Sequence, residues 1–145
     1  MMKVDIYQVS YTASFHNCFV DKINFTENLI GDQNIEIRIG HTITGKVMPE
    51  TISTKKILSD VYFVYFDEFN CYNDAIPLSV YSVVRMHSNP FSYSTEKETL
   101  FYIVAQTPAE VYYIIRNNSE LSAIAAPKNP EDFFDVKLYK LGVLY

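Results

Sequence analysis

The chain has 145 residues, of which 48% are hydrophobic, and it carries a formal net charge of -5 with a pI of about 5.1. This length and hydrophobic content exclude a disordered chain and predict one globular domain spanning residues 1–145. The acidic balance disfavours binding to duplex nucleic acid, which usually needs a basic stripe, and Lys55 and Lys56 form the only adjacent basic pair.

The sequence also indicates a compartment. No apolar run approaches the ~20 residues that span a bilayer, so we expect no membrane association. Lys3 is followed closely by Asp5, without the continuous apolar stretch of a secretory signal. We therefore expect a cytoplasmic protein, found in a host cytoplasm or a virion if its source is viral.

The two cysteines, Cys18 and Cys71, are far apart and have no CxxC spacing. We expect buried free thiols rather than a disulfide, given the expected compartment. Four clustered zinc ligands cannot be assembled from the motifs of this chain. The sequence therefore predicts no metal site and no cofactor.

Aromatic residues are unusually frequent, with 12 tyrosines and 10 phenylalanines, whereas tryptophan is absent and glycine occurs only 4 times. Tyrosine buries a large ring and keeps a polar tip, so it suits the edge of a core and a protein interface equally. The amino-acid composition, which is rich in Asn, Ile, Tyr and Lys and poor in Gly, is typical of proteins encoded by AT-rich genomes. A phage or mobile element is one such source, and an AT-rich cell is another.

In the first third of the chain, alternating apolar and polar residues predict a strand over residues 3–11. Residues 13–30 are ambiguous, because helical spacing of aromatic residues competes with turn-forming asparagines. Alternating isoleucines predict a half-buried strand over residues 35–39, and residues 41–47 suit a short second strand. The polar residues 48–60 predict a loop with room for one helical turn.

The middle of the chain predicts two strands and a connection. Residues 61–69 are apolar on both faces, as in a central strand. Residues 78–87 alternate, with apolar side chains at most even positions and amphipathic ones at most odd positions. The polar residues 88–98, which include Pro90, predict a connection.

The clearest unit lies in the last third. β-branched and aromatic residues predict a strand over residues 99–105. Thr107 followed by Glu110 forms a capping box, and Pro108 falls at the first helical position, so a helix is predicted over residues 108–117. The turn between strand and helix carries no glycine cradle and no nucleophile, which indicates a packing role.

The predicted helix presents Val111, Ile114 and Ile115 as one apolar stripe, which we expect to be buried. Residues 119–126 are too short a segment to classify, and residues 135–145 predict the last strand. The predicted order of strand 99–105, helix 108–117 and strand 135–145 suits a β-α-β crossover between two parallel strands. In the alternative, the helix leads back to an antiparallel strand. The sum is a single α+β domain with a mostly antiparallel sheet of about five or six strands and one well-defined helix.

No motif predicts a catalytic residue. A histidine-based hydrolase needs a histidine beside a nucleophile or a carboxylate. None of His16, His41 and His87 lies in such a motif.

Two pairs of adjacent acids, Asp67 with Glu68 and Glu131 with Asp132, have side chains of the kind that bind metals or transfer protons. Neighbours on a strand point to opposite faces, and the second pair follows a proline, so a structural explanation is simpler for each. A small hydrolase or nuclease is an alternative function, and it requires at least two members of a set to converge around a pocket. The set is His16, His41, His87, Asp67 and Glu131.

Five residues form the candidate binding set. If the strands at residues 61–69, 78–87 and 99–105 are neighbours, these five side chains share one sheet face. Two of them, on the strand over residues 78–87, are expected to lie side by side and partly exposed, because the apolar even positions claim the inward side. The set is Tyr62, Tyr81, Arg85, His87 and Tyr102, and the two expected to be exposed are Tyr81 and Arg85.

We therefore expect a non-enzymatic binding or assembly protein that uses a tyrosine-rich sheet face to contact another protein or a second copy of itself. The structural alternative is that the helix over residues 108–117 covers this face and makes it core. Stacking of single-stranded nucleic acid on the tyrosines is a further alternative, which the acidic charge disfavours.

Overall fold

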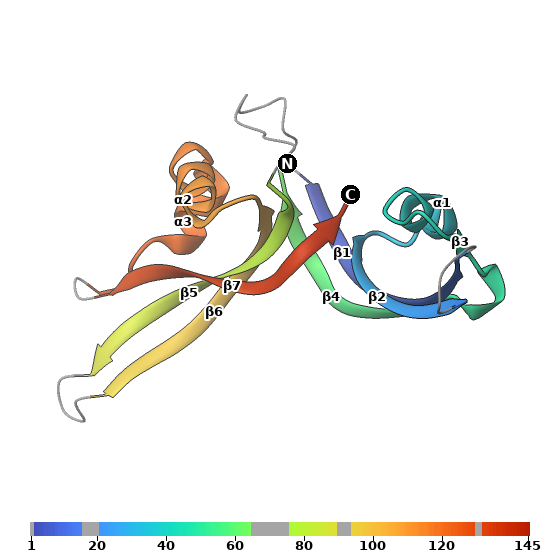
Figure 1. Cartoon of the computed structure of the whole chain (residues 1–145). Helices are drawn as coiled ribbons and strands as arrows, with labels where there is room; N and C mark the ends of the chain where they lie inside the picture. Colours follow the sequence, from blue (N-terminus) through green and yellow to red (C-terminus); the bar gives the residue numbers. More distant parts are fainter. Residues whose placement is uncertain (1, 16–20, 65–75, 90–93, 130–131) are drawn as a thin grey trace. The chain divides into compact units, whose positions relative to one another are not determined.

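The computed structural model describes residues 2–15, 21–64, 76–89, 94–129 and 132–145 (Figure 1). Within these ranges the protein consists mainly of strands, and its pairings are both parallel and antiparallel. The α+β class is therefore confirmed. The sheet, however, is mixed, and its seven described strands exceed the predicted number.

Short helices interrupt the succession of strands at three places along the described chain. The strands are β1 (Met2–Ser14), β2 (Lys22–Ile30), β3 (Lys46–Val47), β4 (Ser53–Phe63), β5 (Leu78–Asn89), β6 (Ser94–Ala105) and β7 (Phe133–Leu144). The helices are α1 (Ile35–Gly40), the 3-10 helix η1 (Pro49–Thr51), α2 (Pro108–Asn117) and α3 (Ser119–Ala125).

The chain divides into two compact units. Unit 1 comprises Met1–Lys3 and Val61–Leu141, and unit 2 comprises Val4–Asp60 and Gly142–Tyr145. β1, β4 and β7 each contribute residues to both units. A single domain over residues 1–145 therefore stays a prediction.

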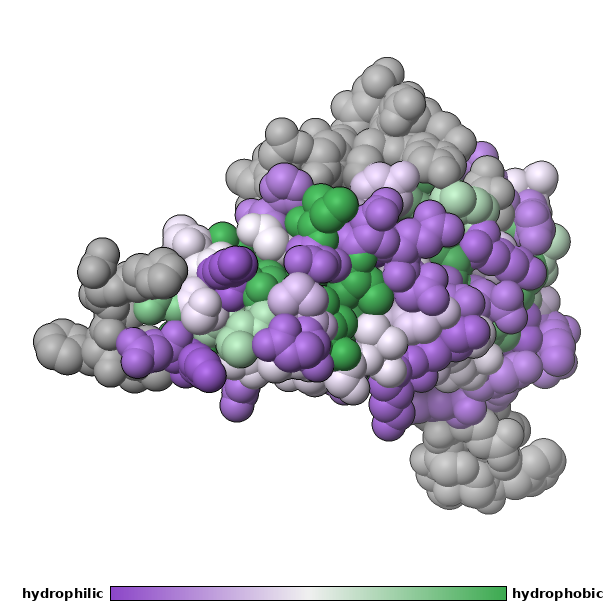
Figure 2. All heavy atoms as spheres, turned by 90° about the vertical axis from the view of Figure 1, so that its right-hand side faces the viewer, coloured by the Kyte–Doolittle hydropathy of each residue, from purple (hydrophilic) through white to green (hydrophobic). Residues whose placement is uncertain are grey.

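In unit 2, β1 is the strand with most partners. It runs antiparallel to β2 from Ile6, opposite Ile30, to Ser14, opposite Lys22, and it also pairs with β3 and β4. Figure 2 shows the side on which α1 and β3 are drawn in Figure 1, where hydrophobic residues are visible between hydrophilic ones. One buried hydrophobic cluster of this unit consists of Val9, Tyr11, Ala13, Leu29, Ile39 and Val47.

Helix α1 stands where residues 35–39 predict a strand, so that prediction is wrong. Ile35 and Ile39 are four residues apart, and this spacing also places them on one face of a helix. Ile39 is fully buried, whereas Ile37 is 63% exposed. Arg38 fixes the helix through hydrogen bonds to backbone carbonyl groups. Its acceptors are the oxygens of Ile30, Gly31, Gln33 and Leu144.

The predicted loop over residues 48–60 contains η1 and most of β4, so this prediction is also wrong. Residues 53–56 are polar and exposed, and no alternation of apolar residues marks them as a strand. A salt bridge connects β4 to β1, with 3.2 Å between Lys56 Nζ and Asp5 Oδ2. The ambiguous segment is resolved as strand where it forms β2.

In unit 1, β5 pairs antiparallel with β6, and β6 pairs in parallel with the end of β4. β7 lies on the other side of β5, so β6 and β7 are separated by β5 and do not form an adjacent pair. The predicted connection over residues 88–98 is largely strand, because β5 ends at Asn89 and β6 begins at Ser94. Residues 65–69 of the predicted central strand lie outside the described residues.

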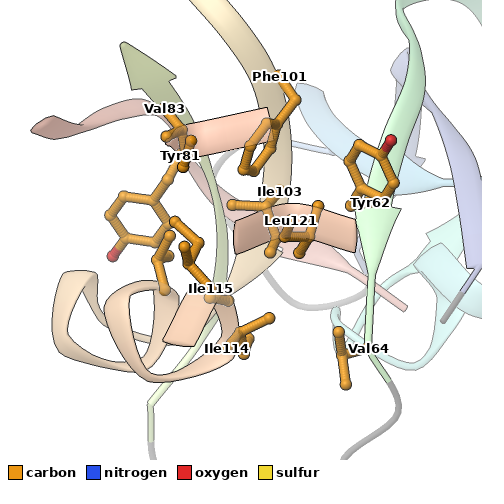
Figure 3. Packing of buried hydrophobic residues seen from close by; sticks show 12 residues of the cluster. Tyr62, Val64, Tyr81, Val83, Phe101, Ile103, Ile114, Ile115 and Leu121 are labelled. Carbon is orange, nitrogen blue, oxygen red and sulfur yellow. The ribbon is translucent and has the colours of Figure 1, made fainter. Parts of the chain in front are cut away.

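Helix α2 confirms the prediction for residues 108–117. The Oγ1 atom of Thr107 accepts a hydrogen bond of 3.2 Å from the amide of Glu110. The predicted apolar stripe is buried in the core of unit 1 (Figure 3). The stripe consists of Val111, Ile114 and Ile115.

Helix α3 occupies most of the segment that the sequence left unclassified. Asn118 ends α2 and caps α3, because its Oδ1 atom accepts a hydrogen bond of 3.0 Å from the amide of Leu121. Leu121 and Ala125 are buried in the same core as the α2 stripe. Both helices therefore cover the same face of the β5–β6 pair.

Candidate functional site

Tyr62 and Tyr81 lie in the core of unit 1, with 8% and 5% of their surface exposed. Figure 3 shows Tyr81 beside Ile115 of α2. The Tyr62 ring packs edge-on against Phe101, with 5.3 Å between the centroids, and the Tyr81 hydroxyl donates to the carbonyl of Gln106 at 3.3 Å. The predicted exposure of Tyr81 is therefore wrong.

Arg85 is only 5% exposed, so its predicted exposure is wrong as well. Its Nη2 atom donates to the carbonyl oxygens of Ile124 at 2.8 Å and Ala126 at 3.0 Å, where α3 ends. Its Nη1 atom lies 3.2 Å from Glu98 Oε2. The last carbonyl groups of a helix lack hydrogen-bond donors within the helix. Here the guanidinium group is their donor, and this contact holds α3 on the sheet.

The physical source of this error is the covering of both faces of β5. Periodicity separates the two faces of a strand, but it does not say how many of them are covered. Val80 at an even position is fully buried, and Tyr81 at an odd position is nearly so. The alternative in which helices cover the odd face is therefore correct.

Tyr102 does not share the face of Tyr81. Tyr102 is paired with Ser82, whereas Tyr81 is paired with Ile103, so the two tyrosines point to opposite sides of the sheet. Tyr102 is partly buried, and its ring packs edge-on against Tyr139 with 5.0 Å between the centroids. The structure therefore does not bring the candidate binding set together on one face.

His87 is the centre of a charged network in unit 1. Its Nδ1 atom lies 2.9 Å from Asp132 Oδ1, and its Nε2 atom lies 3.4 Å from Glu98 Oε2. The same Glu98 oxygen contacts Arg85. β5 supplies Arg85 and His87, β6 supplies one carboxylate, and the segment before β7 supplies the other.

Asp132 is held by the turn that precedes β7. Its Oδ2 atom accepts hydrogen bonds from the backbone amides of Lys128 at 3.2 Å and Asn129 at 3.0 Å. Its side chain is 3% exposed. Both carboxylate oxygens therefore have partners, and one of them orients the His87 ring.

The network favours a protonated His87. The hydrogen bond to Asp132 raises the pKa of His87, and Glu98 adds to this effect. The hydrogen bond from His87 lowers the pKa of Glu98. Burial opposes the ionisation of Asp132, but the bonds from His87 and from the Asn129 amide outweigh it and lower the pKa of Asp132. The His87 ring is thus held between two carboxylates, and both contacts favour its charged form.

A groove of about 460 Å³ lies beside this network and includes Asp132 in its wall. Its volume is in the range that accepts a small ligand or a large side chain. Tyr112 lines it, with its hydroxyl 3.3 Å from Asp135 Oδ1 and its ring 5.3 Å from that of Phe134. Ile115 and Phe133 extend the apolar wall.

Among the described side chains of β7, three apolar ones are exposed, Phe133 and Tyr139 at odd positions on one face and Leu138 at an even position on the other, and we call the three together the β7 surface. Phe133 is 56% exposed, Leu138 is 55% exposed and Tyr139 is 44% exposed. Sequence reasoning did not single them out. The only signal was the alternation within the predicted last strand, which does not reveal how much of either face is covered.

The set required by the hydrolase alternative is tested only in part. Three of its members lie outside the described residues, as do both cysteines. His41 is exposed at the end of α1 in unit 2, and His87 belongs to unit 1. Convergence of the set therefore stays a prediction. The residues outside the described ranges are His16, Asp67, Glu131, Cys18 and Cys71.

Comparison with protein-family models, with curated proteins and with solved structures found no match. In the described part of the chain, no helix is both long and apolar enough to cross a membrane. Nor do the side chains described there include a group of three or more His, Cys, Asp or Glu residues that could hold a metal ion. Fold and site together define an α+β protein with a histidine–carboxylate network beside an aromatic groove.

Proposed function

We propose that this chain is a non-enzymatic binding or assembly protein that acts through protein–protein contacts of the β7 surface. The observation that carries the proposal is the exposure of Phe133, Leu138 and Tyr139, each at least 44% accessible on a single strand. Apolar surface left in water is unfavourable, and a partner that covers it recovers this free energy. Aromatic side chains are also enriched at protein interfaces.

The groove supports the same proposal. Phe133 belongs to both the groove wall and the β7 surface, so a partner that covers Phe133 also reaches the groove. Arg116 lies at the groove and is exposed. Interfaces commonly place an apolar anchor in such a pocket with a charged group at the rim. An apolar side chain followed by an acidic group would fit this site.

Affinity capture from the source organism tests the proposal. Wild type is compared with the double variant Phe133→Ser and Tyr139→Ser. Ile37→Ser is the matched control, because Ile37 is 63% exposed and belongs to unit 2. Losing an interface anchor costs about 2 kcal/mol of binding free energy. We therefore expect the amount of partner captured by the double variant to be lower than that captured by wild type or by the control, by a factor of about ten or more. Equal retention by all three proteins would refute the proposal.

A small hydrolase or nuclease is the second candidate, favoured by the 2.9 Å contact between His87 and Asp132 beside the groove. A histidine oriented by a carboxylate is suited to general base catalysis. However, its second ring nitrogen faces Glu98 and not a nucleophile. Hydrolysis of p-nitrophenyl acetate or bis(p-nitrophenyl) phosphate that is lost in His87→Gln would favour this candidate, whereas equal rates in both proteins would count against it.

Stacking of single-stranded nucleic acid on the candidate binding set has lost its structural basis. The rings of Tyr62 and Tyr81 are buried by the chain itself and present no face to a base. Arg85 is occupied by the end of α3 and by Glu98.

A further inference from the structure

We infer that β7 pairs edge to edge with β7 of a second copy of this chain, antiparallel and about a two-fold axis at Val136. This pairing rests on the proposed assembly function and gives that function its partner. Residues 132–140 read Asp-Phe-Phe-Asp-Val-Lys-Leu-Tyr-Lys, a pattern that is complementary to itself when reversed. Acidic and aromatic residues before Val136 match basic and apolar residues after it.

One edge of β7 has no paired strand over most of its length among the described residues of unit 1. β5 is hydrogen-bonded to one side of β7, and β2 is paired with it at Val143 and Leu144. Among the strands that the structure describes, none is paired with this edge between Phe133 and Lys140. An open edge presents a row of unpaired N–H and C=O groups to which a further strand can bind.

The peptide groups of Val136 point toward the open edge. The carbonyl of Lys137 faces β5, since it accepts a hydrogen bond of 3.4 Å from Ser82 Oγ. Backbone groups of successive residues point to opposite edges of a strand, so those of Val136 face away from β5. At this edge the Val136 amide donates to the side chain of Asp135 at 2.9 Å, and the Tyr112 hydroxyl of α2 lies against the same amide.

A two-fold axis at Val136 places opposite charges of the two copies next to each other and also aligns their backbone hydrogen-bonding groups. The outward N–H and C=O groups of Val136 bond to those of Val136 in the second copy. Asp135 then lies opposite Lys137 of the second copy, and the symmetry makes this pair occur twice. Directly opposite residues on antiparallel strands interact, and opposite charges there are favourable.

The same axis covers the β7 surface. Phe133 lies opposite Tyr139 of the second copy, which sets an aromatic ring against an aromatic ring. Phe134 lies opposite Leu138 of the second copy in the same way. The three side chains that define the β7 surface thus each gain an apolar neighbour. This accounts for their exposure in the single chain.

Other alignments lose the complementarity. An axis at Lys137 sets Asp135 against Tyr139 and brings the two copies of Lys137 together. An axis at Asp135 sets Lys137 against Phe133 and brings two aspartates together. A parallel pairing in register also opposes like charges, because each residue then meets its own copy. The sequence therefore specifies both the antiparallel direction and the register.

Asp135 makes local contacts in the single chain that pairing rearranges. Its Oδ1 atom accepts hydrogen bonds from the Val136 amide and from the Tyr112 hydroxyl. In the pair, the Val136 amide donates to the second copy, so Asp135 and the Tyr112 hydroxyl both move away from this amide and Asp135 faces Lys137. The backbone bond lost inside the chain is therefore replaced across the axis.

Two charge-reversal variants test the pairing. Lys137→Asp leaves acidic side chains at both positions, and Asp135→Lys leaves basic ones at both. Either variant alone opposes like charges twice, so we expect its self-association in sedimentation velocity to be at least about tenfold weaker than that of wild type. An equimolar mixture restores both opposite-charge pairs. We expect it to form mixed dimers of near wild-type affinity, identified by their mass in native mass spectrometry.

Two further variants separate the pairing from other causes. Lys55→Asp makes the same charge change on an exposed lysine of β4, and we expect it to associate like wild type. Val136→Pro removes the outward amide without removing a bond to β5, and an edge strand tolerates proline at such a position. We expect this variant to keep its circular dichroism spectrum and to remain monomeric. Recovery in the mixture excludes misfolding, because a misfolded chain does not regain a partner.

Three results would overturn the pairing: a wild-type chain that is monomeric at about 100 µM, reversal variants that associate like wild type, or a mixture that does not recover. A monomeric wild type that still captures a partner dependent on Phe133 and Tyr139 overturns only the self-pairing. The proposed function then stands, with another protein as the occupant of this edge. Loss of both the self-pairing and the captured partner rejects both proposals.

Discussion

Arg85 joins three elements of unit 1 through one buried guanidinium group. It connects β5 to the end of α3 through two carbonyl oxygens and to β6 through Glu98. The fork of N–H groups lets one side chain serve several acceptors at once, which a lysine cannot do as well. Arg85, which was predicted to bind a partner, therefore stabilises the tertiary structure of unit 1 instead.

We expect Arg85→Ala to lower the free energy of unfolding by about 2–4 kcal/mol, because it leaves the carbonyl groups of Ile124 and Ala126 without this donor. Urea denaturation followed by circular dichroism measures the change. Arg85→Lys is the matched control, and we expect it to recover part of the loss. A change in Arg85→Ala below about 0.5 kcal/mol would contradict this stabilising role.

Because of the network around His87, we expect the free energy of unfolding to decrease both at high pH and at low pH. The pKa of His87 is raised above its ordinary value of 6.5, so its contribution is complete below pH 6.5 and is lost as the pH rises through the raised pKa. The pKa values of Glu98 and Asp132 are lowered from 4.5 and 3.8, so their contributions are lost as the pH falls through the lowered values. The network stabilises the fold most between pH 4.5 and 6.5.

We therefore expect wild type to need more urea for unfolding at about pH 5.5 than at about pH 8.5. His87→Gln removes the titrating ring and should reduce this difference. Urea midpoints for both proteins, measured at the two pH values, check the prediction. A difference that is unchanged in His87→Gln would assign the pH dependence to other groups.

At the scale of elements, local signals decide which predictions succeed. α2 was predictable because the cap, the proline and the apolar stripe all lie within its own residues. α1 was not, because three alternating isoleucines fit a strand and a helix equally well over so short a segment. The first half of β4 was missed because it pairs through its backbone while its side chains are polar and exposed.

The cap of α2 gives a direct test at this scale. Thr107→Ala removes the acceptor of the Glu110 amide and should cost about 0.5–2 kcal/mol of stability. Thr107→Ser keeps a hydroxyl at the same place and is the matched control. Urea denaturation of the three proteins measures both effects. Equal stability of all three would show that the cap contributes nothing.

The packing of α2 is tested by a second substitution. Ile115 is 3% exposed and lies in the core shared with Tyr81. Ile115→Ala should cost about 2–5 kcal/mol, because the cavity it leaves is only partly filled by relaxation. Arg116→Ala, at an exposed neighbouring position, should change stability by less than about 0.5 kcal/mol. A small effect of Ile115→Ala would place this residue outside the core.

At the scale of the whole molecule, the sequence predicted the class of the fold better than the location of a site. Alternation showed that β5 has two distinct faces, but the covering of its odd face depends on α2 and α3, which are distant in sequence. The partners of His87 likewise come from β6 and from the turn before β7. Such contacts arise only from tertiary structure, and no local pattern encodes them.

The continuity of three strands makes a prediction for the whole chain. β1, β4 and β7 each contribute residues to both compact units. Unfolding of unit 1 therefore frees one end of three strands whose other ends belong to unit 2. Because strand pairing is cooperative, we expect a single unfolding transition for the chain. Thermal unfolding followed by circular dichroism and by tyrosine fluorescence should give the same midpoint.

Ile115→Ala sharpens this prediction, because it weakens only the core of unit 1. In a cooperative chain this substitution lowers the protection of the β1–β2 amides of unit 2 against hydrogen exchange as much as that of the α2 amides. Amides in unit 2 that keep their wild-type protection would show that the units unfold independently. The single domain predicted from the chain length would then be two cooperative units joined by shared strands.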